Sequence, residues 1–218
     1  MIQSIAMALG TTGSAIVTMV CAYLLGSLSF AIIVCKLTLG KDIRSYGSGN
    51  AGLTNAYRTM GAQKTLLVLL GDMGKAAAAL AIGGILLGAG GKLLAGAFVI
   101  LGHVYPVYFG FRGGKGVLVG AMTLLLFDWR IFLIAFGIFV LMVTVTRWIS
   151  LGSIVGALSV PFTMYYFYHN MLYTAAISVL AIAVIYLHRS NIKRILAGTE
   201  NKFSVHAKPV IGEESDKH

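Results

Sequence analysis

Residues 16–35, IVTMVCAYLLGSLSFAIIVC, decide the fold class, because these 20 residues carry no charge. An α-helix of about 20 apolar residues is long enough to cross the hydrocarbon core of a bilayer. No positively charged region precedes this stretch, so we expect a retained helix rather than a cleaved signal peptide. The stretch therefore predicts a membrane protein whose first membrane span lies near its amino terminus.

The rest of the chain has the same apolar character. Its 218 residues are 58% hydrophobic and only 11% charged, with a mean hydropathy of +0.86, whereas about a quarter of the residues in a soluble domain are charged. We predict an all-α polytopic membrane protein with about seven transmembrane helices, at residues 16–35, 65–87, 93–108, 117–127, 131–145, 151–168 and 172–187. Several are shorter than a straight span, so five full spans with re-entrant pieces are the alternative. Residues 1–218 would form a single domain with a mobile cytoplasmic tail from about residue 202.

The basic residues predict the orientation of these helices. Lys and Arg collect in cytoplasmic loops, and the predicted spans place 14 of the 17 on one side of the membrane. Lys92 and Arg130 fall on the other side, and Lys75 lies within a span. The amino terminus is then outside and the carboxyl terminus cytoplasmic. The Lys and Arg residues of the predicted cytoplasmic side account for the net charge of +10. Because no basic stretch has interleaved aromatic residues, we predict no nucleic-acid partner.

Three polar clusters interrupt the apolar sequence, all on the predicted cytoplasmic side. They are residues 45–55 (SYGSGNAGLTN) with Arg58, residues 110–116 (GFRGGKG), and residues 188–191 (HRSN) with Glu200. Glycines let backbone N–H groups approach an anion closely, and cations complete such a site. The clusters therefore favour phosphate binding. Flexible turns, a basic cytoplasmic loop and a polar tail are the alternative interpretation.

The first two clusters supply the predicted phosphate ligands. The second cluster leads directly into a helix, whose amino terminus adds a positive dipole, although it lacks the Walker P-loop pattern. The predicted ligands are Ser45, Ser48, Gly49, Asn50, Thr54, Asn55, Arg58, Arg112, Gly113, Gly114 and Lys115.

Ionisable residues within the predicted spans are further candidates, because such residues are costly in lipid and often functional. His103 precedes the second cluster, and we predict a catalytic role for it, with hydrogen-bonded packing as the alternative. Asp72 and Lys75 lie one helical turn apart and could pair with each other. Lys75 could also reach toward the cytoplasmic site in a supporting role.

The third cluster completes the set of predicted catalytic residues. His188 and Asn191 are three residues apart and share a helix face. Ser150 could cap the helix that follows it or donate its hydroxyl to a phosphate. We predict catalytic roles for His188, Asn191 and Ser150 and a supporting role for Glu200; a surface tail is the alternative for the residues after 187.

Several other chemistries have no matching motif in the sequence. It contains no His-Glu-x-x-His motif, Cys-x-x-Cys motif or carboxylate cluster, so we predict no catalytic metal and no cofactor. A Gly-x-Ser-x-Gly hydrolase motif is absent too. Neither His103 nor His188 has an aspartate five residues later, so the His-x4-Asp motif of the better-known glycerolipid acyltransferases is missing.

Taken together, the motifs resemble one membrane enzyme family. Residues 45–55, 102–106 (GHVYP), 111–117 (FRGGKGV), 150–154 (SLGSI) and 188–192 (HRSNI) through 198–200 (GTE) carry the resemblance, in this order. The family is the integral-membrane acyl-phosphate:glycerol-3-phosphate acyltransferases, called PlsY. The chain departs from it locally: Arg112 stands where the family often has Lys, Leu118 and Val119 replace a small pair, and Ala76 replaces Gly after Lys75.

The resemblance implies a reaction, partners and a location. A fatty acyl group would pass from acyl phosphate to the 1-hydroxyl of glycerol 3-phosphate, giving 1-acylglycerol 3-phosphate (lysophosphatidic acid) and phosphate. This is the first step of bacterial phospholipid synthesis. Acyl-CoA and acyl carrier protein would not be direct donors. The enzyme would have seven helices and lie in the bacterial cytoplasmic (inner) membrane, in contact with lipid, with its active site on the cytoplasmic side.

Other functions also fit parts of the sequence. A small transporter of phosphate esters fits the basic loops and the intramembrane Asp72 and Lys75, although no inverted repeat is evident. A phosphatase acting on acyl phosphate and a lipid-binding structural protein are further alternatives. The sequence leaves open the acyl-chain preference, the acceptor of the hydroxyl proton, the pairing of cations with phosphates, the oligomeric state and regulation.

Overall fold

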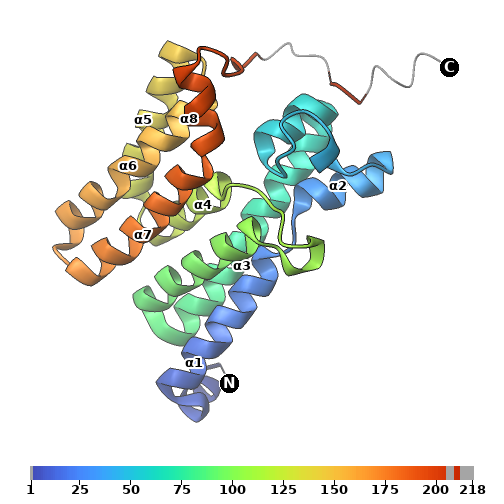
Figure 1. Cartoon of the computed structure of the whole chain (residues 1–218). Coiled ribbons are helices and arrows are strands. Elements are labelled where there is room, and N and C mark those ends of the chain that lie inside the picture. Colours follow the sequence, from blue (N-terminus) through green and yellow to red (C-terminus); the bar gives the residue numbers. More distant parts are fainter. Residues whose placement is uncertain (1, 205–208, 212–218) are drawn as a thin grey trace. The chain divides into compact units, whose positions relative to one another are not determined.

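A computed structural model describes residues 2–204 and 209–211 (Figure 1). Every regular element in these ranges is helical, which confirms the predicted all-α class. The α-helices are α1 (Ile2–Gly26), α2 (Phe30–Leu39), α3 (Leu53–Val104), α4 (Val117–Phe127), α5 (Trp129–Thr146), α6 (Ile149–Tyr168), α7 (Met171–Leu187) and α8 (Arg189–Leu196). Two short 3-10 helices, η1 (Ile43–Ser45) and η2 (Val107–Phe109), lie in the polar loops.

Two glycines divide the long helix α3. Gly61 and Gly88 have φ values of 78° and 62°, a left-handed conformation that glycine adopts without a steric penalty. The limbs on either side of Gly88 lie against each other, because a Cβ atom on Gly83 would touch the carbonyl of Gly91. These limbs, residues 62–87 and 89–104, correspond to the separate helices predicted at 65–87 and 93–108.

Four helical stretches of the described residues are long and apolar enough to cross a membrane: Gly10–Leu39, Leu53–Phe109, Trp129–Thr146 and Ile149–Tyr168. Helices α7 and α8, bent by 54° relative to each other, would add a fifth span, and α4 is shorter. The predicted span at residues 16–35 contains the break between α1 and α2. The count of seven spans and the orientation of the termini stay predictions.

The described residues belong to two compact units. The first contains residues 1–127 and 207–218, of which 2–127 and 209–211 are described. Helices α1, α2 and α4 all pack against α3. Small residues allow close helix approach in membranes, and here Gly26 contacts the backbone of Val99. The core near the polar loops consists of Ala31, Ile32, Val34, Cys35, Ile43, Ala51, Ala56, Met60, Val68 and Ile211.

The second unit contains residues 128–206 and holds α5 to α8, with α6 packed against both α5 and α7 (Figure 1). At one end, Asp128 caps α5 by accepting the Arg130 N–H, and it also accepts the Tyr168 hydroxyl at 2.9 Å. The side-chain hydrogen bond from Arg130 lowers the pKa of Asp128 to about 2. The assignment of the whole chain to a single domain stays a prediction.

Outward-facing side chains of the second unit are strongly apolar. Val145 and Phe162 are 73% and 71% exposed. Exposed apolar surface of this kind suits lipid as the surrounding solvent. The helices of this unit are therefore built to lie in a bilayer.

Candidate phosphate-binding clusters

Two polar clusters hold most of the predicted site residues, one in each unit. The amino-terminal cluster comprises the loops at residues 40–52 and 105–116 with the adjoining parts of α3. The carboxyl-terminal cluster comprises Ser150, His188, Asn191, Arg194 and Glu200. We describe each cluster separately.

Asn55 fixes the shape of the loop at residues 40–52, which we call the glycine-serine loop. Its side chain is 3% exposed, and its Oδ1 accepts the Ser48 N–H at 2.8 Å. Its Nδ2 donates to the carbonyls of Tyr46 and Ile43 at 3.1 and 3.4 Å. Gly47 has a φ of 58°, and a Cβ atom there would collide with Oδ1 of Asn55. The predicted phosphate ligand Asn55 thus has its amide engaged by the loop, which indicates a supporting role.

The remaining loop residues are accessible. Ser45, Ser48 and Gly49 are exposed, whereas Asn50, Thr54 and Arg58 are half-buried. The loop leads into the amino terminus of α3, where the N-cap residue is Gly52 and no side chain caps the helix. The first N–H groups of a helix have no partner within the helix and carry a partial positive charge. This terminus and the serine hydroxyl of Ser48 can therefore face an anion.

Arg44 ties the two glycine-containing loops together. Its Nη1 donates to the carbonyls of Phe109 and Arg112 at 2.6 and 3.2 Å. Its Nε and Nη2 donate to both carboxylate oxygens of Asp42, at 3.0 and 2.8 Å. The side-chain hydrogen bond from Arg44 lowers the pKa of Asp42 and raises that of Arg44 itself, so the pair stays ionised at neutral pH. The Asp-x-Arg spacing signals the pair with Asp42 but not the contacts of Arg44 with the second loop.

Gly113 and Gly114 bring the second loop directly onto His103. Their N–H groups donate to the carbonyls of Val104 and His103 at 3.0 and 3.1 Å. A Cβ atom on Gly114 would collide with Nε2 of His103 and would lie 2.9 Å from the carbonyl oxygen of Ala51. This differs from the predicted phosphate binding by these two glycines, because both N–H groups are already used. Lys115, half-buried, and Arg112, exposed, remain the cations of the loop.

Because of this close approach, Gly114→Ala is expected to lower kcat/KM for the reaction that the sequence predicts by about 100-fold, the size of effect that displacement of reacting groups by about 1 Å produces. The added methyl must push away the His103 ring or the backbone of Ala51. Steady-state kinetics on protein in lipid would measure the change. Gly120→Ala is the matched control, since its Cβ atom would lie 3.7 Å from Ile100, an ordinary contact. Equal activity of both variants would contradict the packing described here.

A buried group of three ionisable side chains lies behind the loops. Lys75 Nζ lies 2.7 Å from Asp72 Oδ1 and donates to the Leu28 carbonyl at 2.7 Å and to Nδ1 of His103 at 3.1 Å. The side chains of Asp72 and Lys75 are 1% and 2% exposed. The predicted Asp72–Lys75 pair is therefore present. An ammonium has only donors, so beside a charged Lys75 Nδ1 of a neutral His103 ring accepts and the ring proton is on Nε2, which faces Gly114.

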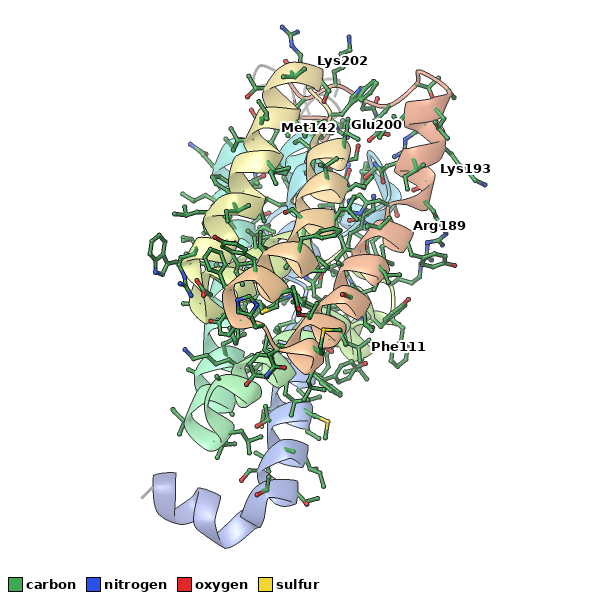
Figure 2. The ribbon with its side chains drawn as sticks, turned by 90° about the vertical axis from the view of Figure 1, so that its left-hand side faces the viewer. Phe111, Met142, Arg189, Lys193, Glu200 and Lys202 are labelled. Carbon is green, nitrogen blue, oxygen red and sulfur yellow. The ribbon has the colours of Figure 1, made fainter. Side chains whose placement is uncertain are left out.

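Glu200 organises the carboxyl-terminal cluster. Its Oε1 accepts from the Ser150 hydroxyl and from Nδ2 of Asn191, and its Oε2 accepts from Nε of Arg194, each at 2.7 Å. Figure 2 shows Glu200 on the inner side of α8, whereas Arg189 and Lys193 point away from this unit. The structure thus joins three of the predicted residues and adds Arg194, which we had not predicted. Its position three residues after Asn191 places it on the same helix face and was the available signal.

A turn after α8 brings Glu200 back onto that helix. Gly198 has a φ of 70°, and the N–H groups of Gly198 and Thr199 donate to the carbonyls of Ile195 and Arg194. Such left-handed glycine turns satisfy the last carbonyls of a helix. Farther along, in the segment predicted as a mobile tail, the Phe203 N–H donates to the Arg147 carbonyl at 2.7 Å. Local glycine chemistry therefore positions the central carboxylate of the cluster.

His188 lies at the bend between α7 and α8 and is 3% exposed. Its Nδ1 lies 2.7 Å from the Val184 carbonyl. A carbonyl only accepts, so Nδ1 carries the proton, and Nε2 is the acceptor nitrogen of the neutral ring. His103 and His188 thus have opposite tautomers. In the part of the chain that the structure describes, no three His, Cys, Asp or Glu side chains form a metal site.

Comparison with known proteins identifies closely similar chains. A sequence model of the family described as "Glycerol-3-phosphate acyltransferase" matches residues 16–198. The glycerol-3-phosphate acyltransferase of Carboxydothermus hydrogenoformans is 40% identical over 83% of this chain and 92% of its own length. That of Clostridioides difficile is 42% identical over 87% of this chain and 95% of its own length.

Solved structures give the same result. A crystal structure of PlsY, an integral membrane glycerol 3-phosphate acyltransferase, in its glycerol 3-phosphate form matches this chain with a TM-score of 0.82 and 34% identity. It matches 88% of this chain and 96% of its own. The lysophosphatidic acid form of PlsY has a TM-score of 0.80 and 32% identity, with 88% and 97% covered. The family match at residues 16–198 includes the loops of the amino-terminal cluster and also Ser150, His188, Asn191 and Arg194.

Proposed function

This chain belongs to the glycerol-3-phosphate acyltransferase family of integral membrane enzymes, and we propose that its acyl donor is an acyl phosphate. The acyl group passes to the 1-hydroxyl of glycerol 3-phosphate, giving 1-acylglycerol 3-phosphate and inorganic phosphate, in the first step of bacterial phospholipid synthesis. The observation that carries the proposal is the amino-terminal cluster, where Arg44 holds two basic, glycine-containing loops together beside the uncapped start of α3.

This cluster suits substrates that both carry phosphate. Two phosphate groups repel each other strongly in a region of low dielectric, so they need several positive or dipolar partners. We assign Ser48, Asn50 and the first N–H groups of α3 to the binding of one phosphate. Arg58 and Lys115 offset the combined negative charge of both phosphate groups. Ser45, Gly49, Thr54 and Arg112 lie in the same loops and complete the polar surface.

The tautomers separate the roles of the two histidines. His103 presents an N–H at Nε2 and serves as a hydrogen-bond donor to a substrate oxygen. His188 and Asn191 orient glycerol 3-phosphate, and Nε2 of His188 has the lone pair that a proton acceptor needs. The Ser150 hydroxyl donates a hydrogen bond to Glu200, so we assign Ser150 to positioning in place of the predicted catalytic role.

The chemical step needs little more than positioning. The glycerol hydroxyl oxygen attacks the acyl carbon, the bond between that carbon and the phosphate oxygen breaks, and the hydroxyl proton leaves to an acceptor. Phosphate is already a good leaving group. Holding the two substrates in reactive geometry therefore supplies most of the rate enhancement.

The same proposal covers the location of the enzyme. The enzyme has seven spans in the bacterial cytoplasmic membrane, and the distribution of Lys and Arg supports an orientation with the amino terminus outside and both clusters on the cytoplasmic side. Labelling of single cysteines placed after residue 40 and before residue 16 would test this orientation in intact cells.

A donor comparison tests the proposed activity. Purified protein in lipid would receive labelled glycerol 3-phosphate with palmitoyl phosphate, palmitoyl-CoA or palmitoyl acyl carrier protein. We expect labelled lysophosphatidic acid with palmitoyl phosphate alone. Comparable product from palmitoyl-CoA would refute the acyl-phosphate assignment and leave the family membership intact.

A further inference from the structure

A short segment near the carboxyl terminus lies against the amino-terminal cluster. It consists of residues 209–211 (Pro-Val-Ile), which we call the strap. The family match ends at residue 198, so the strap lies outside the matched region. It belongs to the first compact unit, together with α1 to α4.

The strap donates hydrogen bonds to carbonyls at the end of a short helix. The first segment of α3 runs from Leu53 to the break at Gly61, and the last carbonyls before such a break lose their partners within the helix. The Val210 N–H donates to the Arg58 carbonyl and the Ile211 N–H to the Thr59 carbonyl, each at 3.2 Å. Two of these carbonyls are therefore satisfied by the strap.

The side chains of the strap reinforce this contact. Pro209 covers Gly61, because its Cγ lies 3.0 Å from the place where a Cβ atom on Gly61 would stand. Ile211 is 6% exposed and belongs to the same core as Ile43, Ala51 and Ala56. These three core residues flank or lie within the glycine-serine loop. The strap thus packs under the loop and at the end of the helix that carries Arg58.

We propose that the strap is a positioning element of the phosphate site. It holds the helical segment that begins at Leu53, and with it Arg58, at the place where a substrate phosphate binds. Its residues touch no substrate and act through Arg58 and the glycine-serine loop. This inference rests on the proposed function of the cluster in binding phosphorylated substrates.

Truncation tests the strap. A chain ending at Lys208 is expected to show a rise of about tenfold in KM for at least one of the two phosphorylated substrates, with kcat within twofold of wild type, because misplacing a binding group weakens substrate binding. A chain ending at Ile211 retains the strap and serves as the matched control, with unchanged constants. Val210→Ala is a second control, since the strap uses the backbone of Val210 and its side chain is 48% exposed.

Ile211→Ala keeps the test decisive if the shorter chain does not fold. This variant retains both backbone hydrogen bonds and is expected to raise the same KM about threefold, with Ile211→Val restoring it. A smaller yield of folded protein with an unchanged KM would show a purely structural role and overturn the proposal. Failure of the proposed function can be told apart from failure of the strap proposal, because in the first case the wild-type protein would form no lysophosphatidic acid at all.

Discussion

Replacing Lys75 by methionine is expected to destabilise the protein by about 3–5 kcal/mol, the typical result of removing one partner from a buried ion pair. Lys75 is the cation of the buried group with Asp72 and His103, and it also donates to the Leu28 carbonyl. Without it, a carboxylate at 1% exposure is left without its counter-ion. Thermal unfolding in detergent should show a large decrease in melting temperature, with loss of acyl transfer.

A double variant tests whether the unpaired charge causes the loss of stability. The double variant Asp72→Asn, Lys75→Met removes both charges and should recover part of the lost stability, because no unpaired charge then remains buried. Activity should stay low, since Nδ1 of His103 has lost its donor. A Lys75→Met protein as stable as wild type would contradict the buried pair.

Glu200→Ala is expected to have the second-largest effect, a destabilisation of about 3 kcal/mol, because it removes three hydrogen bonds to an ionised carboxylate, one of them from a charged donor. The acceptor of Ser150, Asn191 and Arg194 disappears together with the carboxylate. Since Asn191 then loses its orientation, kcat/KM should also fall by about 100-fold. Unfolding curves and steady-state kinetics would measure the two effects separately.

Glu200→Gln is the matched control. The amide oxygen can still accept from Ser150 and Asn191, but the ion pair with Arg194 is lost. We expect an intermediate loss of stability. If Glu200→Ala and wild type unfold at the same temperature, the carboxylate does not organise this cluster.

The same carboxylate predicts a dependence of stability on pH. Burial raises the pKa of Glu200, but hydrogen bonds from Asn191, Ser150 and Arg194 outweigh it, so the net pKa is below its ordinary value of 4.5. A lowered pKa in the folded state means that the carboxylate stabilises the fold above about pH 4.5 and that this contribution is lost as the pH falls further. Glu200→Gln should remove this part of the acid sensitivity.

Local patterns predicted the helical segments well. Apolar runs located most helices, and the spacing of Asp72 and Lys75 predicted their pair. The main difference lies at the ends of helices. The apolar run at residues 16–35 hides the break between α1 and α2, whereas the break at Gly88 falls between the helices predicted at residues 65–87 and 93–108.

The composition of the clusters was predictable, but the partner of each side chain was not. Gly113 and Gly114 looked like anion-binding donors, yet their N–H groups close the loop onto α3. Arg44 bonds to carbonyls more than 60 residues away in sequence, and Ser150 bonds to Glu200 over 50 residues. Such long-range contacts depend on the tertiary fold, which sequence spacing alone does not encode.

The measurement that tests the central claim most directly is phosphate release from palmitoyl phosphate by the purified protein in lipid, with and without glycerol 3-phosphate. We predict release that depends on glycerol 3-phosphate and equals, mole for mole, the lysophosphatidic acid identified by mass. Release without the acceptor would contradict the account and indicate a phosphatase. No release from folded protein, together with flux of intact glycerol 3-phosphate across the membrane, would contradict it in favour of a transporter.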